Sequence, residues 1–258
     1  MSASPESSVA PFVLRVYNDG HKGATAFFRN RPFLETLFST APLSTRDKVT
    51  IFVHACSIGA EPYSLALWWL HRVKPGRPDM SIEIVATDID PEFLQFAVQG
   101  CYPQTILEGM TDEERGWFQV EGDSVSVPDE AHALVRFIPP MNFVNDVPME
   151  KFDVVLIMNA LTYVSSQEQQ ETISHAAGYA RELLCVTAFH PDSIAQDIAR
   201  IGFSPLMHNH RQIHQAWVER LSAETVASDD PDYSWKLPPY DDTCADYASR
   251  YGVIFVRA

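Results

Sequence analysis

The sequence predicts an α/β protein with a doubly wound, mostly parallel sheet that is closed by an antiparallel strand. Short apolar runs rich in β-branched residues alternate with stretches whose apolar residues return at helical intervals. The first of these runs breaks at a turn of small residues and continues as a helix, and two further strands come at the end of the chain. Alternating strands and helices are typical of a parallel sheet covered on both faces.

The first strand is expected at 50–53, where Thr-Ile-Phe-Val has the composition of a buried parallel strand. Pro62 suits the first position of the following helix, because its fixed φ is helical and it has no N–H to leave unpaired. Between strand and helix, Gly59 has no Cβ, so a ligand can approach the backbone closely. In open α/β sheets this first strand–loop–helix unit is where nucleotide-like cofactors bind.

A second apolar strand, 82–86, is followed by acidic residues that strengthen this interpretation. Gly59 is the one glycine present of the three in the dinucleotide motif G-x-G-x-x-G, so the loop alone is a weak signal. A carboxylate at the tip of the second strand accepts hydrogen bonds from the ribose hydroxyls of an adenosine cofactor. Asp90 precedes Pro91 and is expected to cap the next helix, so the ribose is assigned to Asp88.

The remaining elements follow from periodicity and from turn residues. Helices are expected at 23–37, 91–100, 111–118, 167–183 and 191–201, and strands at 134–138, 152–158, 184–189, 203–207 and 251–257. Thr25 is the candidate N-cap of the first helix, which makes Arg29 a surface residue of that helix. Gly122 and Asp123 indicate a hairpin. Asn159 follows a buried strand, at the edge where α/β folds bind ligands.

Composition limits the possible partners and the domain count. An apolar content of 46% in 258 residues suffices for one sizeable core, so we expect a tail at 1–22 and one domain at 23–258 with a small β insertion at about 103–140. The formal net charge of -15 argues against nucleic acid and anionic membranes as partners. The four cysteines show no C-x-x-C spacing and no signal peptide is evident, so we expect a cytoplasmic protein with reduced thiols.

Five segments, taken in order, resemble the CheR family of S-adenosylmethionine-dependent methyltransferases, which esterify glutamate side chains of chemotaxis receptors. These segments are Thr25-Ala-Phe-Phe-Arg29, Ala55-Cys-Ser-Ile-Gly-Ala-Glu-Pro-Tyr-Ser64, Ala86-Thr-Asp-Ile-Asp90, Asn142-Phe143 and Asn159 through Tyr163. The resemblance runs from about 23 to about 164. It implies a class I methyltransferase fold, which is Rossmann-like, with S-adenosylmethionine as cofactor and S-adenosylhomocysteine as product.

The resemblance also implies roles for individual residues. Thr25 and Arg29 would lie over the cofactor, Gly59 would belong to its loop, Glu61 would receive the methionine ammonium, and Asp88 would hold the ribose. Asn142 with Phe143, and Asn159 with Ala160, would flank the adenosine and the transferred methyl group. Arg29 and Tyr163 would face the methyl acceptor and are the expected catalytic residues.

The chemistry of methyl transfer fits these residue types. Displacement at a sulfonium requires a close and aligned nucleophile, so positioning is a main source of acceleration. A carboxylate acceptor is already ionised near neutral pH and needs no general base. Arg29 can hold such an acceptor by a bidentate pair while Tyr163 orients it. If the resemblance is set aside, Arg29 is interpreted as a solvated charge on a helix, and Tyr163 is interpreted as an aromatic residue of the core.

Several positions depart from the family pattern and leave the acceptor open. Ile58-Gly-Ala60 stands where the family usually has Thr-Gly-Glu, Met158 replaces a usual Arg, and Gly23 replaces a usual Asn. The usual basic N-terminal domain does not precede the first motif. The acceptor carboxylate is therefore expected on a protein glutamate or on a small-molecule acid. The alternatives are another oxygen or nitrogen atom of a metabolite, and a cofactor-binding sensor or scaffold without turnover.

Three other interpretations are disfavoured. A nicotinamide-dependent enzyme fits poorly with one glycine in the first loop and with the Glu-Pro opening of its helix. His208, His210 and His214 have a spacing that metal ligands can use on a strand, but no Cys or carboxylate completes the set, so no metal is expected. The acidic stretch 223–246 lacks the spacing of an EF-hand and is expected to be a solvated loop.

Overall fold

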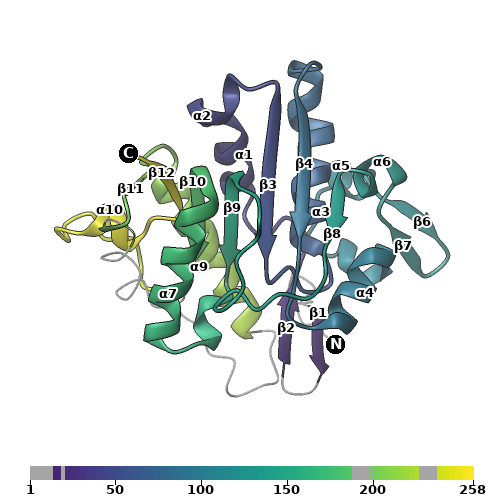
Figure 1. The fold of residues 1–258 in the computed structure, drawn as a ribbon. Coiled ribbons are helices and arrows are strands. Elements are labelled where there is room, and N and C mark those ends of the chain that lie inside the picture. The colour runs from purple at the N-terminus through teal and green to yellow at the C-terminus, as the bar shows by residue number, and fades with distance from the viewer. Residues whose placement is uncertain (1–13, 19–20, 188–197, 199, 227–236) are drawn as a thin grey trace, which may run out of the picture.

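A computed structural model describes residues 14–18, 21–187, 198, 200–226 and 237–258. Within them the main sheet has seven strands, in the order β11-β12-β10-β9-β3-β4-β8 (Figure 1). These strands are β3 (Lys48–His54), β4 (Ser81–Ala86), β8 (Val135–Phe137), β9 (Phe152–Met158), β10 (Ala180–Thr187), β11 (Phe203–Pro205) and β12 (Ile254–Arg257). β10, β9, β3, β4 and β8 run parallel, and β12 is antiparallel to both of its neighbours. The predicted α/β sheet with a closing antiparallel strand is confirmed.

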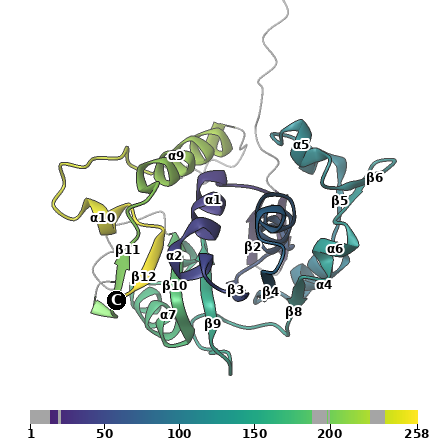
Figure 2. The same ribbon diagram turned by 90° about the horizontal axis from the view of Figure 1, so that it is seen from above.

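Helices cover both faces of this sheet. The α-helices of the described residues are α1 (Arg31–Ser39), α2 (Ala41–Ser44), α3 (Ala60–Trp68), α4 (Pro91–Gln99), α5 (Asp112–Arg115), α6 (Asp129–His132), α7 (Ser166–Tyr179), α9 (His210–Val226) and α10 (Tyr247–Arg250). Figure 2 shows α1 and α9 on one side of the sheet and α7 on the other. Every residue of the central strand β9 is buried, which is why this strand reads as a continuous apolar run.

Two small sheets accompany the main one. β1 (Leu14–Asn18) and β2 (His21–Thr25) form an antiparallel pair, and β5 (Cys101–Pro103), β7 (Ser124–Ser126) and β6 (Gln119–Glu121) form a three-stranded sheet. The expected hairpin at Gly122 is present between β6 and β7. The strand expected at 134–138 is β8, which joins the main sheet beside β4.

The helix expected at 23–37 begins later than the sequence indicated. Thr25 ends β2 instead of capping a helix, and Asn30 is the N-cap of α1, accepting the N–H of Phe33 at 2.9 Å. Phe28, with φ 49°, lies in the left-handed region, so residues 26–30 form a turn. Arg29 therefore lies in this turn and not on a helix surface. Periodicity misled here because the phenylalanines of the turn are buried as deeply as those of a helix.

Other helix boundaries also differ from the expectation. α3 begins at Ala60, so Pro62 is its third residue, where the missing N–H still costs no helical hydrogen bond. α7 ends at Tyr179 and β10 starts directly after it, four residues before the expected strand. The acid-capped turn at 111–118 is confirmed as α5, with a capping box between Thr111 and Glu114. The helix expected at 191–201 and part of the acidic stretch 223–246 lie outside the described residues.

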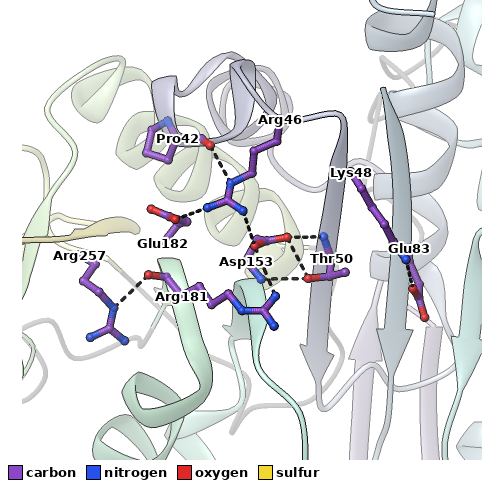
Figure 3. A network of polar contacts seen from close by, with 9 residues as sticks. All are labelled: Pro42, Arg46, Lys48, Thr50, Glu83, Asp153, Arg181, Glu182 and Arg257. Atoms are coloured by element: carbon purple, nitrogen blue, oxygen red, sulfur yellow. Dashed lines mark hydrogen bonds and ion pairs between the residues drawn. The ribbon is translucent and has the colours of Figure 1, made fainter. Parts of the chain in front are cut away.

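A polar network joins the amino ends of the central strands (Figure 3). The buried carboxylate of Asp153 accepts hydrogen bonds from Thr50, N–H at 2.8 Å and Oγ1 at 2.9 Å, and from Arg46 Nη1 at 3.0 Å. Arg46 also contacts Glu182, and Arg181 Nη1 lies 3.6 Å from Asp153. A buried charge with this many partners is a structural feature. It leaves the opposite, carboxyl end of the strands for a ligand site. Among the described residues no helix has the length and apolarity to cross a membrane.

Candidate active site

The loop after β3 holds a strained conformation at the carboxyl end of the sheet. Ala55 and Ser57 both have φ 51°, and Gly59 has φ 90°. Left-handed backbone is unfavourable for residues with a Cβ and is concentrated at functional sites. Two hydrogen bonds with Thr87, the residue after β4, fix the start of the loop: Thr87 N–H donates to Val53 O and Cys56 N–H donates to Thr87 O, both at 3.0 Å.

Gly59 is required by the packing of this loop. Besides the positive φ, a Cβ at Gly59 would lie 3.0 Å from Ala97 Cβ and 3.2 Å from Tyr102 Oη. The missing side chain thus lets the loop pack against α4 and Tyr102. Tyr102 donates its hydroxyl to Ile58 O at 2.7 Å, which ties the three-stranded sheet to the loop. The glycine is therefore needed for the packing of the loop against the protein core.

Asp88 links the tip of β4 to the same loop. Its Oδ2 accepts the N–H of Ser57 at 2.7 Å, and its Oδ1 accepts the N–H of Asp90 at 3.0 Å. Burial raises the pKa of Asp88, and the two N–H donors oppose this shift. Each carboxylate oxygen has a second lone pair, so Asp88 keeps capacity to accept hydrogen bonds from a ribose. Asp90 caps α4 as predicted, through the N–H groups of Glu92 and Phe93.

Glu61 and Arg29 come together although they are far apart in the sequence. Glu61 is half-buried in the first turn of α3, and its burial raises its pKa to about 8. The positive charge of Arg29 opposes this shift, which places the two groups within electrostatic reach. A second positive partner would lower this pKa further and so favour the ionised carboxylate. An ammonium group of a ligand is a partner of this kind.

The turn that carries Arg29 is held on α3 by Ser64. Phe28 N–H donates to Ser64 Oγ at 2.9 Å, and Ser64 Oγ donates to Ala60 O at 2.6 Å. Phe28 packs edge-to-face on Trp117 with ring centroids 5.4 Å apart. Sequence reasoning assigned no role to Ser64. Its position one helical turn after Ala60 was the available signal, because a buried hydroxyl at that spacing can bond the helix and still accept from a neighbouring segment.

Asn159 at the end of β9 is a second strained residue, with φ 60°. Its N–H donates to Thr187 Oγ1 at 2.8 Å, and Thr187 Oγ1 donates to Asn159 Oδ1 at 3.0 Å. The amide Nδ2 of Asn159 and the hydroxyl of Ser57 are buried and have no hydrogen-bond partner among the described residues. Such groups are costly unless a ligand or water satisfies them. Both lie in loops that follow parallel strands, where a ligand site is expected.

The other expected site residues lie around this edge. Asn142 and Phe143 are half-buried in the loop after β8, where Asn142 Oδ1 accepts the N–H of Val144 at 2.9 Å. Ala160 is buried directly after Asn159, and Thr25 is buried at the end of β2. Tyr163 is 50% exposed, so it is not the core aromatic residue of the alternative interpretation.

His54, which sequence reasoning did not single out, is buried beneath the loop at the end of β3. Its Nε2 lies 2.5 Å from Tyr179 Oη, and its ring is 6.4 Å from that of Phe143. Burial lowers its pKa to about 3, so the imidazole is neutral at physiological pH. The residue thus supports the strand end and Phe143 as a neutral hydrogen-bonding group.

The histidine cluster lies before and on a helix, and not on a strand, the setting in which its spacing would suit metal ligands. His210 and His214 are buried on α9, whereas His208 is exposed before it. His210 Nδ1 lies 2.9 Å from Tyr240 Oη, and His214 Nε2 lies 2.8 Å from Pro238 O. The two buried rings thus fasten the C-terminal segment to α9. No group of His, Cys, Asp and Glu within the described part of the chain is arranged to hold a metal ion.

Comparisons with known proteins identify the family of the chain. A family model described as the SAM-binding domain of CheR methyltransferase matches residues 23–186. The chain belongs to the CheR methyltransferase family. The chemotaxis protein methyltransferase of Listeria innocua is 30% identical over 162 residues, 61% of this chain and 60% of that protein. Chemotaxis protein methyltransferase 2 of Pseudomonas aeruginosa is 35% identical over 120 residues, 44% of this chain and 42% of that protein.

The match to the CheR family covers part of each relative, and this chain aligns with about 60% of the Listeria protein's length. Among solved structures, magnesium protoporphyrin IX methyltransferase from Synechocystis with bound SAM has 14% identity and a TM-score of 0.40, over 67% of this chain and 69% of that one. The CheR domain binds S-adenosylmethionine, so S-adenosylmethionine is the cofactor, and the chain is a member of a family of SAM-dependent methyltransferases. The resemblance seen in the motifs is confirmed.

The residues at the carboxyl edge of the sheet fit this cofactor. Ser57 Oγ and Asn159 Nδ2 are buried polar atoms that still need partners, and S-adenosylmethionine offers hydroxyl, carboxylate and adenine groups to bond them. The carboxylates of Glu61 and Asp88 suit its ammonium and its ribose. The charges and the donors that the family pattern requires are therefore present together at one end of the sheet.

Proposed function

We propose that this chain transfers the methyl group of S-adenosylmethionine to a carboxylate oxygen, on a protein glutamate or on a small-molecule acid. The observation that carries the proposal is the hydrogen bond from Phe28 N–H to Ser64 Oγ, which holds the turn with Arg29 on α3, the helix that opens with Glu61. A guanidinium in this place can neutralise an acceptor carboxylate and orient both of its oxygens. The acceptor would then lie beside the cofactor in a position to react.

In this proposal the cofactor is held by two carboxylates and by the loops that present them. Glu61 binds the methionine ammonium, and Asp88, fixed by the N–H groups of Ser57 and Asp90, accepts the ribose hydroxyls. Asn142, Phe143, Asn159 and Ala160 surround the adenosine, and Thr25 closes the site from β2. When bound, S-adenosylmethionine supplies a methyl group on a positively charged sulfur, which an attacking oxygen displaces to give S-adenosylhomocysteine and a methyl ester.

The chain's own residues would contribute position and charge. The acceptor carboxylate is ionised near neutral pH and attacks with its own lone pair, so no proton has to be removed. The buried thiols at this edge fit that scheme, because burial raises the pKa of Cys56 and of Cys185 and keeps both protonated. Arg29 holds the acceptor, and the exposed hydroxyl of Tyr163 is available to orient it.

The relatives favour a protein acceptor, since those from Listeria and Pseudomonas are described as chemotaxis protein methyltransferases. A formal net charge of -15 disfavours a strongly acidic acceptor segment, because like charges repel across an interface. We therefore propose a carboxylate as the reacting group, and the experiment below identifies the molecule that carries it.

The test is transfer of radiolabelled methyl from S-adenosylmethionine to three sets of acceptors: glutamate-containing peptides, N-acetylglutamate α-amide and benzoate. A methyl ester is hydrolysed by mild alkali and releases volatile methanol, so the expected product is base-labile label. Arg29→Lys keeps the charge but loses the planar fork of donors. We expect this variant to raise the KM for the acceptor about tenfold or more, while the affinity for S-adenosylhomocysteine changes little.

Arg77→Lys is the matched control, because Arg77 bonds the backbone oxygens of Leu43 and Arg46 on another part of the molecule. Its kinetics should equal those of the wild type. Base-stable label would show transfer to an atom other than a carboxylate oxygen and contradict the proposal. Tight S-adenosylhomocysteine binding without transfer to any of the three acceptor sets would favour the sensor or scaffold alternative.

A further inference from the structure

The connection between the last two strands is unusually large for its place in the fold. β11 and β12 are antiparallel neighbours, and Leu206 N–H donates to Ile254 O at 2.8 Å, so the two ends of the connection meet. A tight hairpin would suffice to join such strands. Here residues 207–253 intervene, and they lie outside the part of the chain that matches the CheR family, 23–186. The segment is therefore a feature of this chain that the family match does not explain.

The helix of this connection, α9, packs along α1. Asn209 Nδ2 donates to Thr36 Oγ1 at 3.0 Å, and Asn30 Nδ2 donates to Ile213 O at 2.8 Å. The residue with the higher number in the α9 segment is paired with the lower number in the α1 segment, so the two helices run antiparallel. Figures 1 and 2 show α9 beside α1. The contacts of His210 with Tyr240 and of His214 with Pro238 fix the returning segment on α9.

This register brings the next turn of α9 to the candidate active site. Ile213 is already level with Asn30, the N-cap of α1, and Arg29 is the residue before that cap. Trp217 lies one turn further, about 6 Å along the helix axis at 1.5 Å per residue. It shares the buried face of α9 with Ile213, because residues four apart lie on one side of a helix. Trp217 therefore lies beyond the N-cap of α1, on the side where the chain enters that helix from the turn that carries Arg29.

The indole of Trp217 has an unused hydrogen-bond donor. The side chain is 3% exposed, and its Nε1 is buried without a hydrogen-bond partner among the described residues. Buried tryptophan N–H groups usually find a partner. The donor lies on an element that the family match does not include, beyond the end of α1 that joins the turn with Arg29. A ligand oxygen at this place would satisfy it.

We propose that Trp217 is an acceptor-binding residue, whose indole N–H donates to the carboxylate that Arg29 holds, so that α9 forms one wall of the acceptor pocket. This inference rests on the proposed function and deepens it. A guanidinium and an indole N–H, brought from two different elements, suit the two oxygens of one carboxylate. The flat indole face beside them favours an acid whose carboxylate is carried on an apolar or aromatic group.

The tryptophan indole resonances of the ¹⁵N-labelled protein provide a direct test. The full chain is saturated with S-adenosylhomocysteine and titrated with benzoate or with N-acetylglutamate α-amide. Trp217→Phe keeps most of the ring, loses the N–H and identifies the Trp217 resonance by its disappearance. We expect that resonance to shift saturably as its donor gains a carboxylate, and the Phe variant to bind benzoate about tenfold more weakly, as expected for one hydrogen bond to a charged group.

Trp69→Phe is the matched control. Trp69 is also 3% exposed with an unpartnered buried Nε1, but it follows the far end of α3, eight residues from Glu61. Its resonance and its variant's benzoate affinity should match those of the wild type. If S-adenosylhomocysteine binds and the Trp217 resonance responds to neither acid, the inference is wrong, and the methyl-transfer assay with the wild type decides the proposed function separately. If S-adenosylhomocysteine does not bind the wild type, the proposed function fails and this inference fails with it.

Discussion

The backbone N–H of Phe28 donates to the side chain of Ser64 at 2.9 Å, and this bond joins two motifs that are separate in the sequence. Ser64 belongs to the helix that opens with Glu61, and Phe28 belongs to the turn that presents Arg29. The distance between the acidic and the basic group of the candidate site therefore depends on one buried hydroxyl. This hydroxyl also stabilises the left-handed backbone of Phe28, with φ 49°.

Replacing Ser64 by alanine should loosen the turn. Ser64→Ala leaves the N–H of Phe28 buried without an acceptor, so the free energy of unfolding should fall by about 1–3 kcal/mol. Binding of S-adenosylhomocysteine should weaken as Arg29 loses its fixed place beside Glu61. Urea unfolding and calorimetric titration measure the two effects. Ser44→Ala is the control, because Ser44 Oγ bonds Ala41 O at an exposed position.

Glu61 should make the stability of the ligand-free protein depend on pH. Its pKa is about 8 in the folded chain and 4.5 by reference, so between these values the folded state keeps a proton that the unfolded state has lost. The free energy of unfolding therefore falls as the pH rises through this window. Glu61→Gln removes this term, and the variant should be more stable than the wild type at pH 8.

Urea unfolding at pH 5.5 and pH 8 checks this prediction. Glu92→Gln is the matched control, since Glu92 lies in the first turn of α4 at an exposed position. It should reproduce the pH dependence of the wild type. An unfolding free energy of Glu61→Gln that falls as steeply between the two pH values as that of the wild type would contradict the assignment.

Gly59 and Gly178 should respond to alanine in opposite directions. Gly59→Ala combines φ 90° with a Cβ placed 3.0 Å from Ala97 Cβ, so we expect a loss of at least about 1–2 kcal/mol in unfolding free energy. Gly178 lies within α7 with open space around its Cα, and Gly178→Ala should stabilise the protein by about 0.5–1 kcal/mol. Thermal unfolding of the two variants decides the matter. Equal effects would show that the loop after β3 tolerates a Cβ.

Most strands were predictable because burial on both faces leaves a continuous apolar run. The strand expected at 152–158 agrees with β9 at both ends, and Asp90 and Gly100 mark the two ends of α4 as expected. Local chemistry decides these features, since a cap or a buried strand needs only its own neighbours. The helix expected at 23–37 was wrong, because the turn at 26–30 is set by contacts with distant aromatic residues and not by its own neighbours.

The sequence names candidate site residues but does not give their arrangement. The motifs identify Glu61, Asp88 and Arg29, but the loop geometry that holds Asp88 and the turn that presents Arg29 come from tertiary hydrogen bonds. Ser64 and His54 carried no distinctive pattern, because a buried serine or histidine in an apolar run looks like ordinary core. The roles of Ser64 and His54 depend on the residues that they contact in the folded chain.

The sequence by itself determined the α/β class, the strand–loop–helix unit at Gly59 and the family to which the chain belongs. These are local properties, since periodicity, caps and short motifs are written in neighbouring residues. Only the tertiary structure decided that Arg29 lies in a turn beside Glu61 and that α9 runs along α1 towards the site. The physical reason is that packing and long-range hydrogen bonds join segments whose separation in the chain leaves no periodic signal.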